Sequence, residues 1–163
     1  MTTIPPAAPP TRYLGAGGVL ADRADQGTAV TLHSADGATH DGTPYQPAVF
    51  TASGLTLGYH GASTAFALSV DSGTAVGNAV QIRVSFDLTG NGTWDRVETY
   101  RYFATDPVPG AEQYTQDAGL LGVSGQLGDL SGGTVRVEIW SALPGGTSPA
   151  AIGADSTVTL PFS

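Results

Sequence analysis

The stretch Ala79-Val-Gln-Ile-Arg-Val-Ser-Phe86 decides the fold class, because apolar and polar residues alternate along its whole length. A period of two places alternate side chains on opposite faces of a strand. Four apolar residues face one way: Val80, Ile82, Val84 and Phe86. Three polar residues face the other way: Gln81, Arg83 and Ser85. Thr134–Ser141 repeats the pattern with Val135, Val137 and Ile139 inside and Arg136, Glu138 and Trp140 outside.

Further β-type runs, separated by Gly, Pro, Asp and Ser, cover much of the remaining chain. They are Ala29–His33, Val49–Ala52, Leu55–Tyr59, Thr64–Val70, Arg96–Phe103 and Ser156–Phe162. No stretch carries apolar residues at helical spacing over three turns. Asp106–Ala118 is expected to be a loop or one helical turn, because Pro107 and Pro109 oppose a hydrogen-bonded ladder. Eight or nine short strands predict an all-β fold, an antiparallel and jelly-roll-like β-sandwich.

The domain organisation follows from length and from the proline-rich start of the chain. The chain has 163 residues, close to the roughly 150 of a typical single domain. Residues 1–11 carry Pro5, Pro6, Pro9 and Pro10 and are predicted to be a linker, with residues 12–163 forming the domain. This start fits a module joined to a longer chain, and it also fits a short frayed terminus.

The charge and composition exclude several function classes. The net charge is −8, and all six basic residues are arginine, so no basic face is expected for nucleic acid or for an anionic membrane. There is no cysteine, hence no disulfide and no thiolate metal site. No apolar stretch approaches the roughly 20 residues of a membrane span, and the first residues lack the pattern of a signal peptide. We expect a monomer.

One segment, Asp87-Leu-Thr-Gly-Asn-Gly-Thr-Trp-Asp95, has the spacing of a calcium loop. Oxygen-bearing side chains stand at relative positions 1, 3, 5 and 9, with glycine at position 6. The predicted ligands are Asp87, Thr89, Asn91, the Thr93 carbonyl, Asp95 and Glu98, the last at position 12. Strands rather than helices flank the loop, so an EF-hand is not expected. The alternative is a metal-free hairpin turn, because Asn-Gly is a strong hairpin signal and Asp at its base makes Asx-type hydrogen bonds.

The residues around this loop resemble the non-catalytic β-sandwich modules appended to secreted actinobacterial polysaccharide hydrolases, glucanases in particular. The matching stretches are His40–Pro44, Arg83–Pro107, Glu112–Gln116, Gly128–Trp140 and Thr157–Phe162. The resemblance implies a sandwich fold, an extracellular location and a carbohydrate-binding role beside a catalytic domain of the same parent chain. Members of this family often carry Asp where this chain has Asn91, a departure that weakens the calcium prediction.

Candidate sugar-binding residues follow from the chemistry of neutral sugars, which bind aromatic faces and planar polar side chains. The candidates are Arg83, Trp94, Tyr100, Tyr102, Glu138 and Trp140. Trp94 is either a lid over the edge of the core or an exposed platform, and the two faces of Arg96–Phe103 are both mixed. Tyr45, Tyr59 and Tyr114 could form the rim of a site. The ordinary alternative for each tyrosine is a half-buried position in the core.

Catalysis is not expected. Asp87, Asp95 and Glu98 could be imagined as a pair for glycoside hydrolysis, but a metal or a turn accounts for them. No nucleophile elbow, P-loop or dinucleotide motif is present in the sequence. Together with this absence of catalytic motifs, the resemblance implies a module that binds a β-1,3-glucan or another glucan and targets an attached hydrolase. The alternative is a structural or adhesive spacer that binds no sugar.

Overall fold

The computed structural model describes residues 11–33, 38, 42–61, 64–71, 79–104, 111–115, 120–141 and 151–163, with the backbone alone at 71, 79, 101–104, 111–115 and 120–124. Twelve strands and one short 3₁₀ helix make up the secondary structure of these residues. The elements are β1 (Thr11–Gly15), β2 (Val19–Ala21), η1 (Ala24–Gln26), β3 (Val30–Thr31), β4 (Ala48–Leu57), β5 (Ala65–Asp71), β6 (Ala79–Asp87), β7 (Arg96–Ala104), β8 (Ala111–Thr115), β9 (Leu120–Gly125), β10 (Leu130–Ser141), β11 (Ala151–Ile152) and β12 (Thr157–Thr159). The all-β prediction is confirmed.

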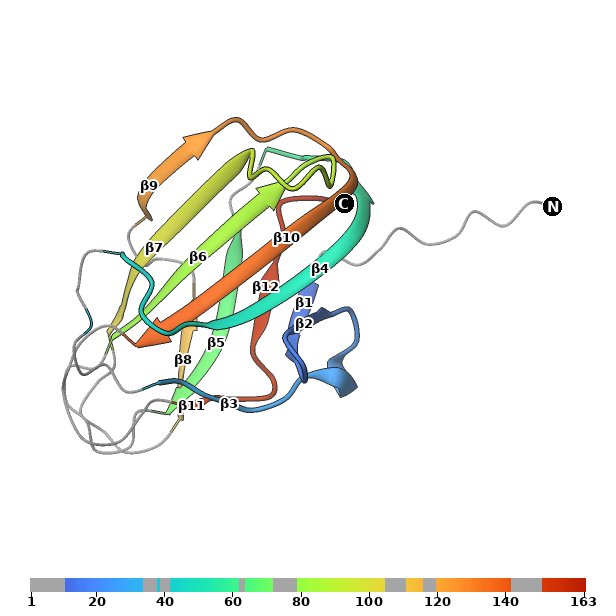
Figure 1. Ribbon diagram of the computed structural model, residues 1–163. Helices are drawn as coiled ribbons and strands as arrows, with labels where there is room; N and C mark the ends of the chain where they lie inside the picture. Colours follow the sequence, from blue (N-terminus) through green and yellow to red (C-terminus); the bar gives the residue numbers. More distant parts are fainter. Residues whose placement is uncertain are drawn as a thin grey trace.

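The strands form one continuous hydrogen-bonded sheet in the order β3-β11-β5-β12-β1-β2-β4-β10-β6-β7-β9, with β8 paired to β5. In Figure 1, β9, β7, β6, β10 and β4 lie in front, and β8, β5, β12 and β1 lie behind them. The rings of Phe66 in β5 and Tyr100 in β7 lie 5.0 Å apart, although these two strands are not neighbours in the ladder. The sheet therefore folds back so that its two parts pack on each other. A jelly-roll-like sandwich of separate sheets stays a prediction.

Two features of this sheet differ from the prediction. The strand number is twelve rather than eight or nine, because very short strands such as β2 and β11, of three and two residues, have no recognisable alternation. The pairing is not wholly antiparallel, since β2 and β4 pair in parallel at Val19 and Thr51. All other strand pairs in the described residues are antiparallel.

The core lies between the two parts of the sheet. The inward residues predicted for β6 and β10 are all buried: Val80, Ile82, Val84, Phe86, Val135, Val137 and Ile139. Opposite them lie Phe66, Leu68 and Val70 of β5, also predicted to share one face, together with Val158 and Phe162 near the C-terminus. Alternation in the sequence therefore predicted the core of the central strands correctly.

Two local predictions are wrong for reasons of backbone chemistry. Val49–Ala52 and Leu55–Tyr59, predicted as separate strands, lie largely in the single strand β4. Gly54 has φ of 68° there, and the β10–β4 ladder shifts register between Leu130 and Val135, so the glycine marks an irregularity rather than a turn. The expected loop around 106–118 contains β8, which begins at Ala111 after the prolines and pairs with β5.

The predicted linker lies outside the described residues except for Thr11, which begins β1 and pairs with Thr159. Nothing in the described part of the chain forms a helix long and apolar enough to cross a bilayer.

Candidate functional site

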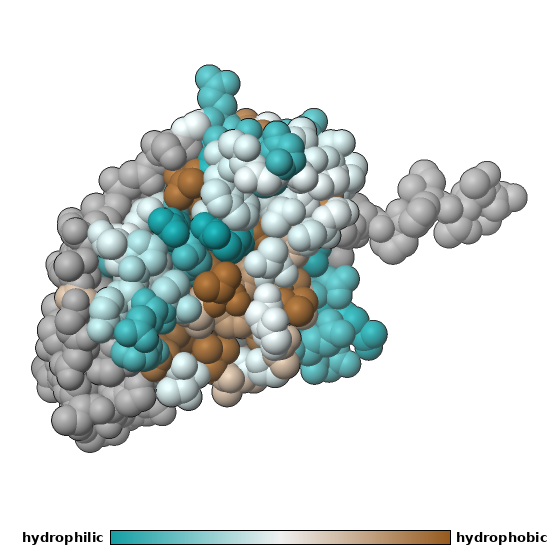
Figure 2. Space-filling view, viewed as in Figure 1, coloured by the Kyte–Doolittle hydropathy of each residue, from teal (hydrophilic) through white to brown (hydrophobic). Residues whose placement is uncertain are grey.

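The outward side chains of β6 and β10 form the polar face that the sequence predicted. In the ladder Arg83 stands opposite Glu138, and Ser85 stands opposite Arg136. The neighbouring strands extend these two rows to Val49 and Thr51 of β4 and to Thr99 and Val97 of β7. We call the surface made by Arg83, Ser85, Arg136, Glu138 and Trp94 the Arg–Glu face. In Figure 2 this side of the molecule shows hydrophilic and hydrophobic residues next to one another.

One carboxylate organises the Arg–Glu face. The Arg83 guanidinium donates two hydrogen bonds to Glu138, from Nε to Oε1 at 2.7 Å and from Nη2 to Oε2 at 3.2 Å. Arg136 Nη2 lies 3.3 Å from Oε1 of the same residue. The Glu138 side chain is 7% exposed, whereas the Arg83 and Arg136 side chains are 30% and 29% exposed. The Glu138 carboxylate is therefore buried beneath the two arginines, which are themselves partly exposed to solvent.

Trp94 joins this face from the loop between β6 and β7. The Arg136 guanidinium carbon lies 4.5 Å from the centre of the Trp94 ring, a cation–π geometry. The ring is half-buried. Trp94 was predicted to be either a lid or a platform. It lies against the outer face of the sheet, with the Arg136 guanidinium on one surface of its ring.

The loop before Trp94 is held together by its own carboxylates. Asp87, 4% exposed, accepts hydrogen bonds from three backbone amides, those of Gly90, Asn91 and Gly92, at 2.8 to 3.2 Å. Asp95 Oδ2 accepts from the Leu88 amide at 2.8 Å. These contacts are the Asx-type hydrogen bonds of a hairpin turn. Gly92 has φ of 87°, the left-handed conformation that the spacing assigned to position 6.

Two other predicted calcium ligands also lie in this loop. Asn91 Oδ1 accepts a hydrogen bond from the Thr93 amide at 3.0 Å, and Thr89 is exposed. Among the residues that the structure describes, no three His, Asp or Glu side chains gather as a metal group. That observation does not test calcium, which also accepts amide, hydroxyl and carbonyl oxygens, so the calcium loop stays a prediction.

Glu98 is wrong as the ligand at position 12, because it points to the other side of the sheet. Its side chain is 3% exposed. Thr64 Oγ1 and Tyr100 Oη donate to Oε1 at 2.8 and 3.1 Å, and Arg96 Nη2 donates to Oε2 at 3.2 Å. A residue eleven positions after Asp87 would have to fold back toward the loop, whereas Glu98 lies within β7.

Tyr100 is wrong as an exposed platform, because the inner face of β7 buries it. It is 2% exposed, packs edge-on against Phe66 and donates to Glu98. Burial, followed by the charge of the Glu98 carboxylate, raises the pKa of the Tyr100 phenol. Tyr102 is in β7 by its backbone, and its side chain lies outside the described residues.

Trp140 lies on the predicted side of β10 but is not an exposed platform. It is 1% exposed, and its ladder partner Gln81 accepts a hydrogen bond from the Gly42 amide at 3.1 Å. The segment 42–47, which leads into β4, therefore covers this end of the face. Alternation assigns a side of the sheet, but it cannot show that a distant loop lies over that side.

The predicted rim tyrosines do not meet at this face. Tyr59 packs against Phe162, with ring centres 5.8 Å apart, and Tyr45 makes an edge contact of the same length with His33. Tyr114 belongs to β8, and its side chain lies outside the described residues. Arg136, by contrast, completes the site although it was not among the predicted ligand-binding residues. Its place on the outer face beside Glu138 was the available signal.

Two open cavities lie elsewhere in the described structure. One, of about 400 Å³, is bounded by Gly15, Val19, Asp25 and Thr28 around η1. The other, of about 320 Å³, is bounded by Thr56, Asp129 and Ser163. Neither includes a residue of the Arg–Glu face, which is a surface rather than a pocket.

Comparison with known proteins bears on the fold alone. No protein-family model matches the chain, and no curated protein sequence matches it. The chain is similar in structure to an α-amino acid ester hydrolase labelled with selenomethionine, with a TM-score of 0.56 at 13% sequence identity. The match covers 95% of this chain and 36% of the hydrolase chain. At 13% identity the similarity concerns the fold alone and gives no information on the activity of this chain.

Proposed function

We propose that the protein is a non-catalytic module that binds a polysaccharide, a β-1,3-glucan or another glucan, on the Arg–Glu face. The observation that carries the proposal is the arrangement of Arg83 and Arg136 around the single Glu138 carboxylate, with Trp94 stacked on Arg136. Guanidinium and carboxylate groups are planar and can bond neighbouring sugar hydroxyls, and an indole ring can stack on sugar C–H groups. A flat sheet face suits an extended chain better than a small molecule, which prefers a concave pocket.

The benefit of such a module lies in effective concentration. A catalytic domain in the same parent chain stays near an insoluble substrate while the module is bound, and its local substrate concentration rises without any new chemistry. The proposal places both domains outside the cell, where polysaccharides are accessible, as the resemblance of the sequence implies.

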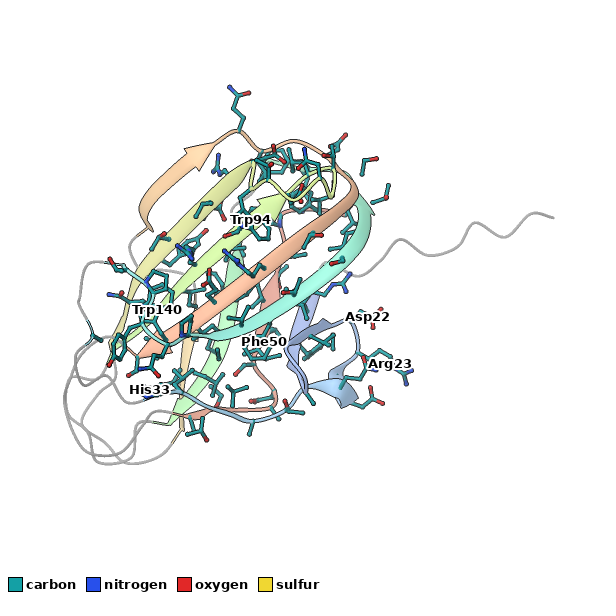
Figure 3. The ribbon with its side chains drawn as sticks, in the orientation of Figure 1. Asp22, Arg23, His33, Phe50, Trp94 and Trp140 are labelled. Carbon is teal, nitrogen blue, oxygen red and sulfur yellow. The ribbon has the colours of Figure 1, made fainter. Side chains whose placement is uncertain are left out.

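The test is retention of the protein on insoluble β-1,3-glucan and on insoluble α-glucan. We expect depletion of the wild type from solution by at least one of them, and a loss of about tenfold in affinity for Arg83→Gln, which removes a charge-assisted partner. Arg23→Gln is the matched control, because Arg23 pairs with Asp25 beside η1 and its side chain is 68% exposed. Figure 3 shows Arg23 far from Trp94.

The outcomes separate the two candidate functions. Retention of the wild type and of Arg23→Gln, with weak retention of Arg83→Gln, supports binding at the Arg–Glu face. No depletion of the wild type by any glucan would overturn the proposal and favour a spacer domain.

A further inference from the structure

Buried donors without acceptors gather on the outer side of β6 and β10. In the described part of the chain six buried side-chain polar atoms have no hydrogen-bond partner. Four of them belong to outward side chains of this strand pair: Gln81 Nε2, Ser85 Oγ, Arg136 Nε and Trp140 Nε1. The other two are the Nε atoms of Arg12 and Arg96. A buried unpaired donor costs about 1 to 3 kcal/mol, so their concentration on one face needs an explanation.

Gln81 and Trp140 are the facing pair among these residues in which both side chains are buried. They stand opposite each other in the β6–β10 ladder, in the row next to Arg83 and Glu138. Gln81 is 0% exposed and Trp140 is 1% exposed. The Gln81 carbonyl oxygen is occupied by the Gly42 amide, while its amide nitrogen and the Trp140 indole N–H have no acceptor among the described residues. Together they present N–H donors and need oxygen acceptors.

The segment 42–47 begins at these donors, on the outer side of the sheet. Its start is tied to the sheet through the bond from Gly42 to Gln81, and Tyr45 packs on His33. Figure 1 shows the chain before β4 crossing the front layer at this end, and Figure 3 shows Trp140 there, with Trp94 at the other end of the same layer. Arg136 and Trp140 are four residues apart in β10, about 13 Å along the strand.

We infer that Gln81 and Trp140 form a second subsite of the polysaccharide-binding face, a donor pair that bonds hydroxyl or ring oxygens of the glycan. This inference rests on the proposed function and extends it along β10. The bound chain runs from Trp94 across Arg83 and Glu138 toward Trp140, and residues 42–47 move aside to admit it. The ligand supplies the acceptors that the protein lacks, which accounts for two buried donors left unpaired in the free protein.

The indole N–H of Trp140 can be observed directly in the unaltered protein. The chain has two tryptophans, so the ¹⁵N-labelled wild type gives two indole N–H signals, and Trp140→Phe identifies the signal of Trp140. The probe is laminarihexaose or maltohexaose, according to which insoluble glucan retains the wild type. We expect the Trp140 signal to move downfield at saturation, because its proton gains an oxygen acceptor. We also expect Trp140→Phe to bind about 3- to 10-fold more weakly, the loss of one hydrogen bond.

The results distinguish the subsite from the proposed function as a whole. If the wild type binds while the Trp140 signal stays in place and Trp140→Phe retains full affinity, the subsite is wrong and the Arg–Glu face stands. A buried water that already satisfies the indole would give this same result. If the wild type binds neither oligosaccharide and is retained on neither glucan, the proposed function fails and the subsite fails with it.

Discussion

Two buried glutamates, Glu98 of β7 and Glu138 of β10, point to opposite sides of the sheet and differ in the donors that surround them. Glu98, on the inner side, is bonded by Thr64, Tyr100 and Arg96. Glu138, on the outer side, accepts hydrogen bonds from Arg83 and forms an ion pair with Arg136. Both side chains are less than a tenth exposed, at 3% and 7%.

The two sets of donors give the two carboxylates different roles. Glu98 holds together part of the core, whereas Glu138 positions two partly exposed arginines on the surface. Two neutral hydroxyl donors and the Phe66 ring fix the surroundings of Glu98 within the core. The donors of Glu138 are long side chains about 30% exposed, which can exchange their partner for a ligand at small cost. Burial of a carboxylate therefore does not by itself mark a site, and the exposure of its partners is the more informative quantity.

The largest expected effect is on stability, and it tests this contrast. Glu98→Ala leaves the two buried hydroxyls of Thr64 and Tyr100 without their acceptor and frees the Arg96 guanidinium, whose side chain is 22% exposed, so we expect the free energy of unfolding to fall by about 2 to 4 kcal/mol. Glu138→Ala releases arginines that can turn to water, and we expect a loss of about 1 kcal/mol. Urea unfolding measures both. Equal losses in the two variants would show that the two sides are not energetically distinct.

A smaller effect, on the pH dependence of stability, follows from the hydrogen bond that Tyr100 donates to Glu98. Because burial and Glu98 raise the pKa of Tyr100 in the folded state, the folded protein holds the phenol proton more tightly than the unfolded chain. This contribution to stability is complete below the ordinary phenol pKa of about 10 and is lost as the pH rises above it. We expect the stability difference between the wild type and Tyr100→Phe, about 1 kcal/mol at pH 8, to shrink between pH 10 and 11.5.

Urea unfolding of both proteins over that pH range gives the measurement. Other phenols titrate in the same range in both proteins, so only the difference between the two curves reports Tyr100. Parallel curves would mean that Tyr100 loses its proton as easily in the folded state as in the unfolded chain.

The sequence predicts the centre of the fold well because there a period of two coincides with burial on one side. The apolar residues of β6 and β10 are buried as alternation requires. β1, β2, β8, β9 and β11 were missed. β2 and β11 are only three and two residues long, and β11 pairs through Ile152 with the distant residues Val30 and Val70. The pairing of such a short strand depends on residues far away in the sequence, which a local pattern does not encode.

For the site, the sequence places Arg83 and Glu138 on one side and leaves Trp94 open as a lid or a platform, but it does not foresee the burial of Trp140, Tyr100 and Glu98. The mixed faces of β7 left the orientation of Glu98 and Tyr100 open, and only the core partners Thr64 and Phe66 decide it. Trp140 is buried, and its ladder partner Gln81 is bonded to Gly42, nearly 100 positions earlier in the chain than Trp140. Alternation in the sequence indicates on which side of the sheet a side chain lies, whereas its exposure to solvent depends on long-range packing.

The smallest expected effect concerns Asp87, a third buried carboxylate, whose donors are neighbouring backbone amides rather than side chains. We propose that calcium binds this loop through Asp87, Thr89, Asn91, the Thr93 carbonyl and Asp95, and that the ion adds to a turn already closed by hydrogen bonds. Binding to the folded state alone raises stability as calcium exceeds its dissociation constant. We therefore expect millimolar calcium to raise the melting temperature by about 2 to 4 °C, and a chelator to reverse the rise while the protein stays folded.

Asp95→Asn, which keeps an oxygen for the Leu88 amide, should abolish the calcium response at little cost to the calcium-free protein. Identical melting temperatures in calcium and in chelator would leave the hydrogen-bonded turn as the complete account of this loop, and Asp87 would then join Glu98 as a structural carboxylate.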